Sequence, residues 1–476
     1  MATRPYSVAG DWRTGEGSFE VTSPYDGSVV AEIGKPTDGD VEEAVSSAAA
    51  AFAETQHLPA HVRAEALAHV SRRIAERSEE LATSIAREGG KPLKWARIEV
   101  SRASSTFRWA GEEARRFGGE LMRLDTDAGL GSRLGIIRRF PFGPVLGITP
   151  FNFPVNLVAH KVAPALAVGA PIVVKPASAT PLGALALAGL IAETDLPGAI
   201  YSVLPVPGSK AEELAKDRRF KKISFTGSSG VGWRLKAIAD PRNRVTLELG
   251  GNAGVIVHSD ADLDHAAERV AIGGNYQGGQ SCIAVQRVLV QAEVYDDFVP
   301  RLVKQVEGLK VGDPLDETVD VGPLIDSGAV DKVAEFVDEA VSQGAEVLCG
   351  GTREGQIYRP TVIARTKPDM KVRCEEIFGP VVTVDPYETF DEALALVNDS
   401  EYGLQAGVFT KDVERAMLAH RELVVGGVIV NDVSAFRADQ MPYGGAKDSG
   451  FGREGLRWAM DEMTEPRILV LSNVPL

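Results

Sequence analysis

Short apolar runs alternate with helix-length segments through the middle of the chain, and this alternation restricts the possible fold more than any other feature. Short apolar runs bounded by turn residues are typical of buried strands, and strands that alternate with helices favour a parallel α/β sheet. Helices are expected over 157–168 and 182–193. The expected strands of this first series cover 145–149, 172–175, 200–204 and 222–225.

A second alternating series begins near Asn252. Its expected strands cover 255–257, 287–290, 381–384 and 427–430. A chain of 476 residues is long for one hydrophobic core, so two or three domains are expected. The segment 248–251, with its paired glycines, falls between the two series and is expected to form the turn between domains. These patterns predict an α/β fold with two doubly wound parallel-sheet domains.

Other elements are expected outside the two series. Apolar spacing predicts amphipathic helices over 41–54, 61–76 and 96–116. The segments 136–140 and 467–471 are predicted to be short strands, although they lie far apart in the sequence. Strands left unpaired would be aggregation-prone edges, so an oligomer is expected.

Charge and composition argue against several classes of partner. The net charge of -15 makes nucleic acid or an anionic membrane an unsuitable main partner. No apolar run reaches the roughly 20 residues of a membrane span, and residues 1–6 lack the apolar segment of a signal peptide. Three scattered cysteines do not form a disulfide framework. The expected location is therefore the cytoplasm.

Two short segments carry the strongest chemical signal. Residues 248–251 read Glu-Leu-Gly-Gly and residues 279–282 read Gly-Gln-Ser-Cys, so Glu248 precedes Cys282 by 34 positions. A glycine-flanked cysteine suits a nucleophile that a substrate must reach closely, and a carboxylate before paired glycines can activate a water or that thiol. Most protein thiols are buried and inert, and only Cys282 has a context that argues otherwise.

Three further blocks accompany these two segments: Pro-Phe-Asn-Phe-Pro at 150–154, Phe-Thr-Gly-Ser at 225–228 and Glu-Glu-Ile-Phe-Gly-Pro at 375–380. The five blocks together resemble the NAD(P)-dependent aldehyde dehydrogenase family in their order and spacing, and the resemblance runs from about Val8 to the C-terminus. Within the family, the sequence looks most like the branch of lactaldehyde, phosphonoacetaldehyde and semialdehyde dehydrogenases.

The resemblance implies a division of the chain into three parts. A Rossmann-like cofactor-binding domain is expected over 1–120 and 143–249, and a catalytic domain over 250–434. The segments 121–142 and 456–476 are expected to form a small oligomerisation sheet that pairs with another subunit. A homodimer or homotetramer follows from this expectation.

The resemblance also implies the chemistry of three residues. Cys282 as a thiolate would attack the aldehyde carbon, while Asn152 and the backbone N–H of Cys282 would donate to the oxyanion of the thiohemiacetal. Hydride transfer to a nicotinamide would leave a thioester, and Glu248 would activate the water that hydrolyses it. No metal is expected.

Two glycine-rich segments compete for the cofactor. The segment 450–455 matches Gly-x-Gly-x-x-Gly but follows a loop, whereas a dinucleotide fingerprint needs a strand before it. The segment 225–232 follows a strand and opens a helix whose N-terminus can bind a pyrophosphate. Ser178 stands where NAD-preferring relatives often carry glutamate, so NADP is expected to compete with NAD. The residues expected to bind NAD or NADP are Lys175, Ser178, Gly208, Gly227, Ser228, Gly232, Glu376 and Phe378.

Arg108, His160 and Arg437 fall on positions that line the substrate funnel in the family. Each alone is more typical of a solvated or salt-bridged side chain. Together they predict a fixed anion on the substrate, because arginine binds a carboxylate or phosphonate through two parallel hydrogen bonds. The predicted substrate is a short anionic aldehyde, with phosphonoacetaldehyde or a semialdehyde favoured. Lactaldehyde or a broad range of neutral aldehydes is the alternative.

Two other functions remain open at this stage. A CoA-acylating dehydrogenase would pass the acyl group to CoA and would not need a base for water, so Glu248 argues against it. A catalytically silent binding protein would be expected to have lost some of Asn152, Glu248, Cys282 and Glu376, and all four are present.

Overall fold

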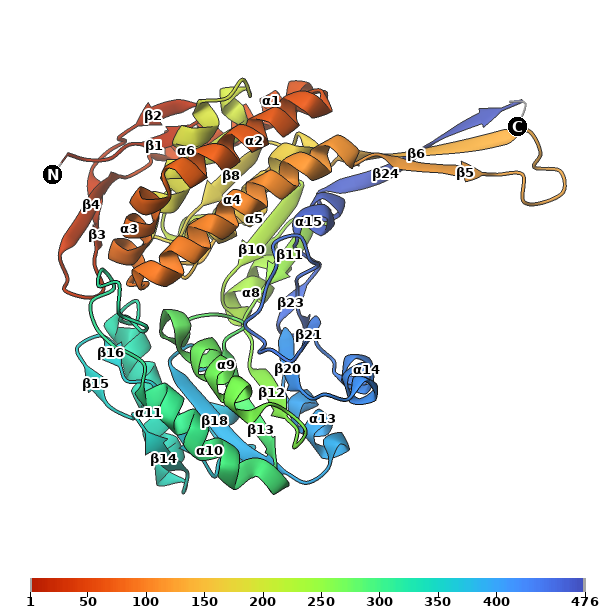
Figure 1. Cartoon of the computed structure of the whole chain (residues 1–476). Helices are drawn as coiled ribbons and strands as arrows, with labels where there is room; N and C mark the ends of the chain where they lie inside the picture. Colours follow the sequence, from red (N-terminus) through yellow and green to blue (C-terminus); the bar gives the residue numbers. More distant parts are fainter. Residues whose placement is uncertain (1, 474–476) are drawn as a thin grey trace.

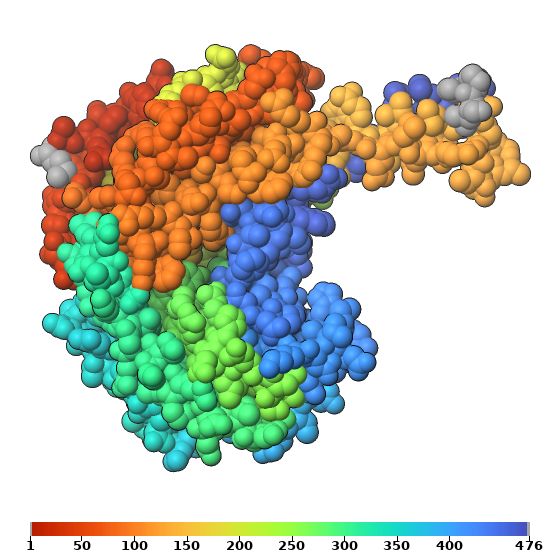
Figure 2. Space-filling model, viewed as in Figure 1, coloured from red at the N-terminus to blue at the C-terminus, as the bar shows by residue number. Residues whose placement is uncertain are grey.

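Two β-sheets covered by helices form two lobes, and a long arm projects from the first lobe (Figure 1). The computed structural model describes residues 2–473. The surface is hollowed between the arm and the second lobe (Figure 2). Within the described residues, no helix is long and apolar enough to cross a membrane.

The first sheet combines strands from the N-terminal half with one short strand from near the C-terminus. Its order is β2 (Asp11–Arg13), β1 (Tyr6–Val8), β9 (Tyr201–Val203), β8 (Ile172–Lys175), β7 (Val145–Ile148), β10 (Lys222–Thr226), β11 (Arg244–Glu248) and β23 (Gly450–Phe451). The four strands expected for the first series are confirmed to within one residue at each end.

The strand order of the first sheet reverses between β7 and β10. These two strands pair in parallel, although β8 and β9 separate them in the sequence and lie on the other side of β7. Ligands bind open α/β sheets at such a reversal, outside the carboxyl ends of the strands. The residues that follow β7 and β10, beginning at Thr149 and Gly227, are therefore placed around one crevice.

The second sheet has the order β14 (Glu346–Cys349), β17 (Thr361–Ala364), β18 (Val381–Tyr387), β13 (Val285–Gln291), β12 (Ala253–Val257), β20 (Gln405–Phe409) and β21 (Gly427–Val430). All of its pairs are parallel except β14 with β17. The chain changes sheet between β11 and β12, across residues 249–252, which is where the sequence predicted the turn. The prediction of an α/β fold with two parallel sheets is confirmed.

Helices cover both sheets (Figure 1). The three predicted N-terminal helices are confirmed, whereas α3 forms where the sequence predicted no element. The main helices are α1 (Asp38–Thr55), α2 (Ala60–Glu76), α3 (Ser78–Gly89), α4 (Leu93–Arg116), α5 (Asn156–Val168), α6 (Leu182–Ala192), α7 (Gly208–Ala215), α8 (Ser229–Ile238), α9 (Leu263–Asn275), α10 (Ala292–Glu307), α11 (Ser327–Ser342), α13 (Phe390–Asn398), α14 (Val413–Glu422) and α15 (Leu456–Glu462).

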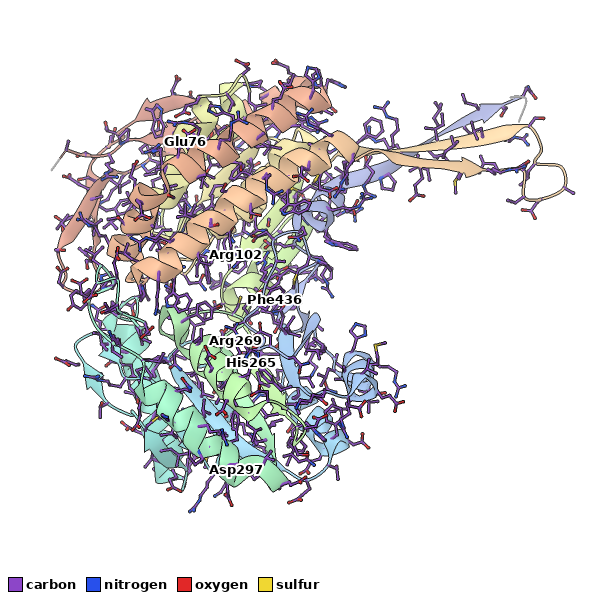
Figure 3. The ribbon with its side chains drawn as sticks, viewed as in Figure 1. Glu76, Arg102, His265, Arg269, Asp297 and Phe436 are labelled. Atoms are coloured by element: carbon purple, nitrogen blue, oxygen red, sulfur yellow. The ribbon has the colours of Figure 1, made fainter. Side chains whose placement is uncertain are left out.

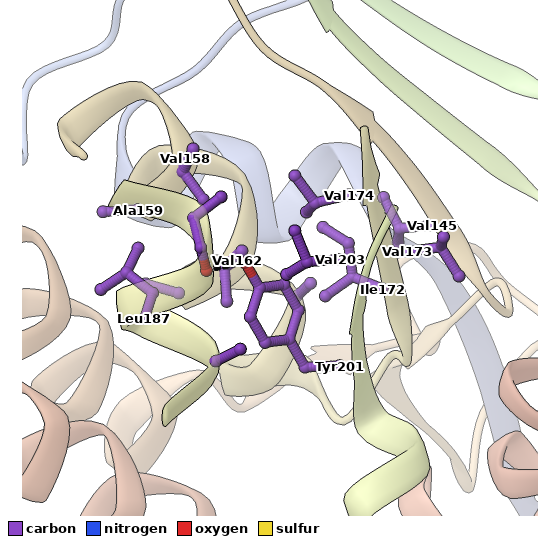
Figure 4. Packing of buried hydrophobic residues seen from close by; sticks show 14 of the residues in the cluster. Val145, Val158, Ala159, Val162, Ile172, Val173, Val174, Leu187, Tyr201 and Val203 are labelled. Carbon is purple, nitrogen blue, oxygen red and sulfur yellow. Dashed lines mark hydrogen bonds between the residues drawn. The ribbon is translucent and has the colours of Figure 1, made fainter. Parts of the chain in front are cut away.

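Helix α5 is buried along its whole length. It is apolar on nearly every side, which is the pattern of a helix inside a core. Val158 and Val162 of α5 belong to the same buried cluster as Val173 and Tyr201 of the first sheet (Figure 4). Burial of each such side chain contributes about 1.5–3 kcal/mol. The helix therefore sits rigidly beside the crevice, and it brings three polar residues, Asn156, His160 and Lys161, into the interior.

The arm consists of β5 (Gly119–Arg123), β6 (Arg133–Pro141) and β24 (Thr464–Ser472), paired antiparallel. The two strands expected far apart in the sequence therefore pair with each other. Residues 456–462 are not part of this sheet, because Leu456 and Met460 turn inward as one face of helix α15. Leu121 and Leu469 are 70% and 54% exposed. Pairing of the arm with another subunit, in a homodimer or homotetramer, stays a prediction.

Gly183 of α6 packs directly against the segment that follows Asn152. A β-carbon on Gly183 would lie 2.7 Å from the carbonyl oxygen of Pro154. We predict that Gly183→Ala lowers the urea midpoint of unfolding, at a cost of about 1–3 kcal/mol, and lowers kcat by displacing that segment.

The matched control is Gly189→Ala in the same helix. A β-carbon there would meet only Cζ2 of Trp12, at 4.0 Å, so the better helix propensity of alanine should leave stability unchanged or raise it by up to about 1 kcal/mol. Equal urea midpoints for the two variants would show that the contact with Pro154 is not limiting.

Candidate active site

Cys282 lies on a loop that is in close contact with the turn after β11. A β-carbon on Gly251 would lie 2.3 Å from the carbonyl oxygen of Cys282, and one on Gly250 would lie 2.3 Å from Oε2 of Glu376. The N–H of Gly251 donates to Oε1 of Glu376 at 2.9 Å. Only a pair of glycines lets the end of β11 approach both loops, which explains the Glu-Leu-Gly-Gly motif.

Glu248 and Asn152 line the same cavity as Cys282. Glu248 ends β11 and is 2% exposed, and neither of its carboxylate oxygens has a hydrogen-bond partner among the described residues. Asn152 follows β7 and donates from Nδ2 to the carbonyl of Gln280 at 2.9 Å. The segments that follow β7 and β11 of the first sheet and the loop before β13 of the second sheet thus bring together the three side chains that the sequence predicted to do chemistry.

Burial disfavours the charged forms of both reactive groups. Desolvation raises the pKa of Cys282 to about 11, while a hydrogen bond with Tyr443 acts in the opposite direction. Desolvation and, next, the negative charge of Glu454 raise the pKa of Glu248 well above its ordinary value. The reactivity of the site therefore depends on the positive charges and hydrogen-bond donors that face these groups.

Two adjoining cavities lie over the carboxyl ends of the first sheet. The cavity at Cys282 has a volume of about 310 Å³ and also contains Glu376 and Phe378. The second has a volume of about 680 Å³ and extends past Lys175 at the end of β8. The two cavities share lining residues Pro150, Phe151, Thr226, Gly227 and Ser228.

Seven of the eight residues predicted to bind the cofactor line these cavities. The exception is Gly232, where a β-carbon would lie 2.4 Å from Cδ2 of Leu249. The role of this glycine is to let α8 pack closely on the segment after β11. Ser228 caps α8 without a side-chain hydrogen bond to the helix, so the N–H groups of the first turn remain available at the cavity.

Arg108 does not lie in the substrate region, and the prediction for this residue is corrected. Its side chain is 52% exposed and pairs with Glu112 at 2.9 Å, one turn further along α4. Arg102 lies six residues earlier and so points to a different side of the helix. Arg102 donates to Asp439 at 2.9 Å, and Figure 3 shows it on the side of α4 that faces the loop carrying Phe436.

His160 is completely buried and Nε2 lies 3.0 Å from Oδ1 of Asp439. Burial, with the positive charge of Arg437 second, lowers the pKa of His160 to about 4. The imidazole is therefore neutral near pH 7 and supplies no positive charge to an anion. This corrects the predicted role of His160, which instead holds Asp439 together with Arg102.

Arg437 is buried beside the nucleophile. Its Nη2 lies 3.3 Å from Oε2 of Glu454, and its guanidinium carbon lies 3.7 Å from the centroid of the Tyr443 ring. Glu454 also accepts from Nζ of Lys161 at 2.8 Å. Arg437 thus remains a candidate for contact with substrate, whereas Lys161 and Glu454 form a buried ion pair next to Glu248.

Comparison with known proteins identifies the architecture. The sequence model described as the aldehyde dehydrogenase family matches residues 12–469. The chain belongs to the aldehyde dehydrogenase family. It is 44% identical to the 3-sulfolactaldehyde dehydrogenase of Priestia megaterium, across 98% of this chain and 97% of that protein. It is 35% identical to the lactaldehyde dehydrogenase of Methanococcus aeolicus, across 98% and 99% of the two chains.

Solved structures agree with this assignment. Aldehyde dehydrogenase 21 from Physcomitrella patens, in complex with the reaction product succinate, superposes with a TM-score of 0.97 at 43% identity, across 99% of this chain and 98% of that one. The glyceraldehyde-3-phosphate dehydrogenase of Methanocaldococcus jannaschii, complexed with NADP, has a TM-score of 0.92 at 36% identity, across 96% and 100%. This chain is therefore an oxidoreductase that acts on aldehydes.

The cavities of this aldehyde dehydrogenase fit a dinucleotide cofactor. The larger one combines a lysine ammonium, a helix N-terminus and glycines without side chains, which is the donor set that a pyrophosphate and a ribose require. A β-carbon on Gly208 would meet nothing within 4 Å, so there is free space at this rim. Within the described residues, no group of three His, Cys, Asp or Glu side chains is arranged to hold a metal ion.

The sequence reading missed several residues of the site. Tyr443 contacts the sulfur of Cys282, and Arg102, Lys161, Asp439 and Glu454 form the polar network around it. Lys161 had a visible signal, because a lysine inside an otherwise apolar helix demands a buried partner. The others had none, because their partners come from segments 161 to 337 positions away along the chain.

Proposed function

We propose that this aldehyde dehydrogenase oxidises a short anionic aldehyde to its carboxylic acid with NAD(P)+, through a thioester on Cys282. The observation that carries the proposal is one cavity in which a thiol, a partner-free carboxyl and an amide donor meet. A hydrolytic enzyme needs these three groups: the nucleophile, the base for water and a donor to the oxyanion.

In the proposed reaction, the residues act one after another. The Cys282 thiolate attacks the carbonyl carbon, and the negative charge that develops on oxygen is stabilised by the side-chain amide of Asn152 and the backbone N–H of Cys282. Bound NAD(P)+ supplies a hydride acceptor, and loss of hydride converts the thiohemiacetal into a thioester. Glu248 then takes a proton from water as that water attacks the thioester, and the thiolate leaves.

The proposed cofactor site uses the residues that line the two cavities. Lys175 and Ser178 would bind the adenosine ribose, the N-terminus of α8 at Gly227 and Ser228 would bind the pyrophosphate, and Glu376 would bind the nicotinamide ribose. Burial raises the pKa of Glu376 to about 7, and the N–H of Gly251 opposes this shift by favouring the carboxylate. A cytoplasmic location stays a prediction.

We predict that Cys282→Ala abolishes the formation of reduced nicotinamide, because no other thiol lines the cavity. Glu248→Gln should form the thioester and stop, so mass spectrometry of the intact protein should show an added acyl group after one turnover. Cys349→Ala serves as the control and should retain wild-type turnover. Robust turnover by Cys282→Ala would contradict the mechanism, and strict dependence on CoA would favour the acylating alternative.

Two buried arginines support the proposal that the substrate is anionic. The Nε–H groups of Arg102 and Arg437 are buried and have no hydrogen-bond partner among the described residues. A buried donor left unpaired costs about 1–3 kcal/mol, so an anion that accepts from it would bind favourably. One relative described above is named for an aldehyde that carries a sulfonate, and another is in complex with succinate, a product with two carboxylates. Phosphonoacetaldehyde remains a further candidate, and uncharged lactaldehyde is the main rival.

We predict that Arg102→Ala raises KM for succinate semialdehyde and phosphonoacetaldehyde by about 10- to 150-fold, which corresponds to 1.5–3 kcal/mol for a lost charged hydrogen bond. The value of kcat should change little, and propanal should be unaffected. Arg108→Ala on the same helix is the matched control, since its side chain is exposed. If lactaldehyde and propanal match the anionic aldehydes in kcat/KM, and Arg102→Ala preserves that ranking, the substrate is neutral.

We predict that both cofactors support turnover and that NADP is at least competitive, because Ser178 places no carboxylate at the rim of the larger cavity. Ser178→Glu should lower kcat/KM for NADP relative to NAD by more than about tenfold, or about 1.4 kcal/mol, through repulsion of the 2′-phosphate. If kcat/KM of the wild-type enzyme favours NAD by more than about a hundredfold, a group other than residue 178 distinguishes the two cofactors at the ribose.

A further inference from the structure

The phenol of Tyr443 makes a direct contact with the nucleophile. Its hydroxyl oxygen lies 3.0 Å from Sγ of Cys282, which is close for a hydrogen bond that involves sulfur. Tyr443 is 3% exposed, and its backbone N–H and carbonyl both bond to Glu454, so the ring cannot move away freely. The sulfur and the hydroxyl also share a small apolar cluster with Ile283 and Leu404.

We propose that Tyr443 is a catalytic residue that donates its hydroxyl hydrogen to the sulfur of Cys282 and so favours the thiolate form of the nucleophile, with Arg437 as the positioning residue. This inference rests on the proposed role of Cys282 as nucleophile and adds a residue to it. The phenol keeps its proton throughout, and no bond to Tyr443 is made or broken.

Arg437 contributes through the aromatic face. Its guanidinium carbon lies 3.7 Å from the ring centroid of Tyr443, within the range of a cation–π contact. A cation over the ring withdraws electron density and makes the hydroxyl a stronger donor. Glu454 neutralises part of this charge and fixes the guanidinium in place at 3.3 Å.

The other charged and titratable groups around the sulfur make this donor necessary. Glu248 and Glu376 each raise the pKa of Cys282 by their negative charge, whereas Arg437 lowers it. The hydroxyl of Tyr276 also lies in this region, but it donates to Ser281 at 2.6 Å and not to the sulfur. Among the described residues, Tyr443 is thus the one whose hydroxyl lies within hydrogen-bond distance of the sulfur and can donate to a thiolate there.

The test compares the alkylation of Cys282 in variants that keep the ring. Cys282 is made the only cysteine by Cys349→Ser and Cys374→Ser, since the chain has three cysteines. The rate of alkylation by iodoacetamide is then measured from about pH 7 to 9, below the pKa of the thiol. Loss of the hydroxyl in Tyr443→Phe should raise that pKa by about one unit, which makes the thiolate about tenfold rarer.

The remaining thiolate is more nucleophilic, so the rate should fall about three- to fourfold at each pH. Replacement of Tyr443 alone by difluorotyrosine, a stronger donor of nearly the same shape, should raise the rate. Tyr276→Phe is the matched control and should leave the rate unchanged, although it also removes a buried hydroxyl near the nucleophile. A structural role for Tyr443 would not give changes of opposite sign in the two ring-preserving variants.

Equal alkylation rates for the single-cysteine protein with unmodified Tyr443, the Tyr443→Phe variant and the difluorotyrosine variant would overturn the inference. Because this measurement needs no turnover, it is separate from the test of the proposed function. Failure of the inference would leave Cys282→Ala inactive, whereas failure of the proposed function would leave Cys282→Ala active. If Tyr443→Phe does not fold, the difluorotyrosine variant still decides the outcome.

Discussion

The active site depends on a close approach of backbones that leaves no room for β-carbons. The turn after β11 touches the carbonyl of Cys282 at Gly251 and the carboxylate of Glu376 at Gly250. On the opposite side of the nucleophile loop, a β-carbon on Gly279 would lie 2.0 Å from the carbonyl oxygen of Gly379. Glycine loses more conformational entropy on folding than other residues, but it occurs at these positions because no residue with a β-carbon fits them. The contacts tie the first sheet, the nucleophile loop and the Glu376 loop into one rigid unit.

Burial of the reactive groups determines the electrostatics of the site. Both Cys282 and Glu248 are harder to ionise than in solution, so the fold must provide compensating donors and positive charges nearby. It does so with Arg437 and Lys161, each of which is in turn paired with Glu454. A buried charge without such a partner would cost several kcal/mol, which explains why the polar residues around the site occur as a network.

The sequence predicts the fold better than it predicts the residues of the substrate region. The strand and helix patterns of residues 145–225 are reproduced in the structure, since local apolar spacing decides them. The candidate catalytic residues Glu248 and Cys282 lie in short glycine-containing motifs, and the family resemblance added Asn152. Arg108 was misplaced because a position on a long helix does not reveal which side faces the site, and six residues separate it from Arg102 by well over one turn. His160 is buried against Asp439, and its neutral state depends on burial that the sequence alone does not show.

The amino-acid sequence by itself determined the alternating α/β architecture and the change of sheet at residues 249–252, and it pointed to Asn152, Glu248 and Cys282 as candidate catalytic residues. These features rest on local periodicity and on short-range motifs, which need no knowledge of distant contacts. Only the tertiary structure decided which polar side chains surround the nucleophile. Tyr443 meets Cys282 from 161 positions away, and Arg102 meets Asp439 from 337 positions away. Such pairs arise because separate strands and helices converge on one crevice, and their charge states follow from the burial that this convergence produces.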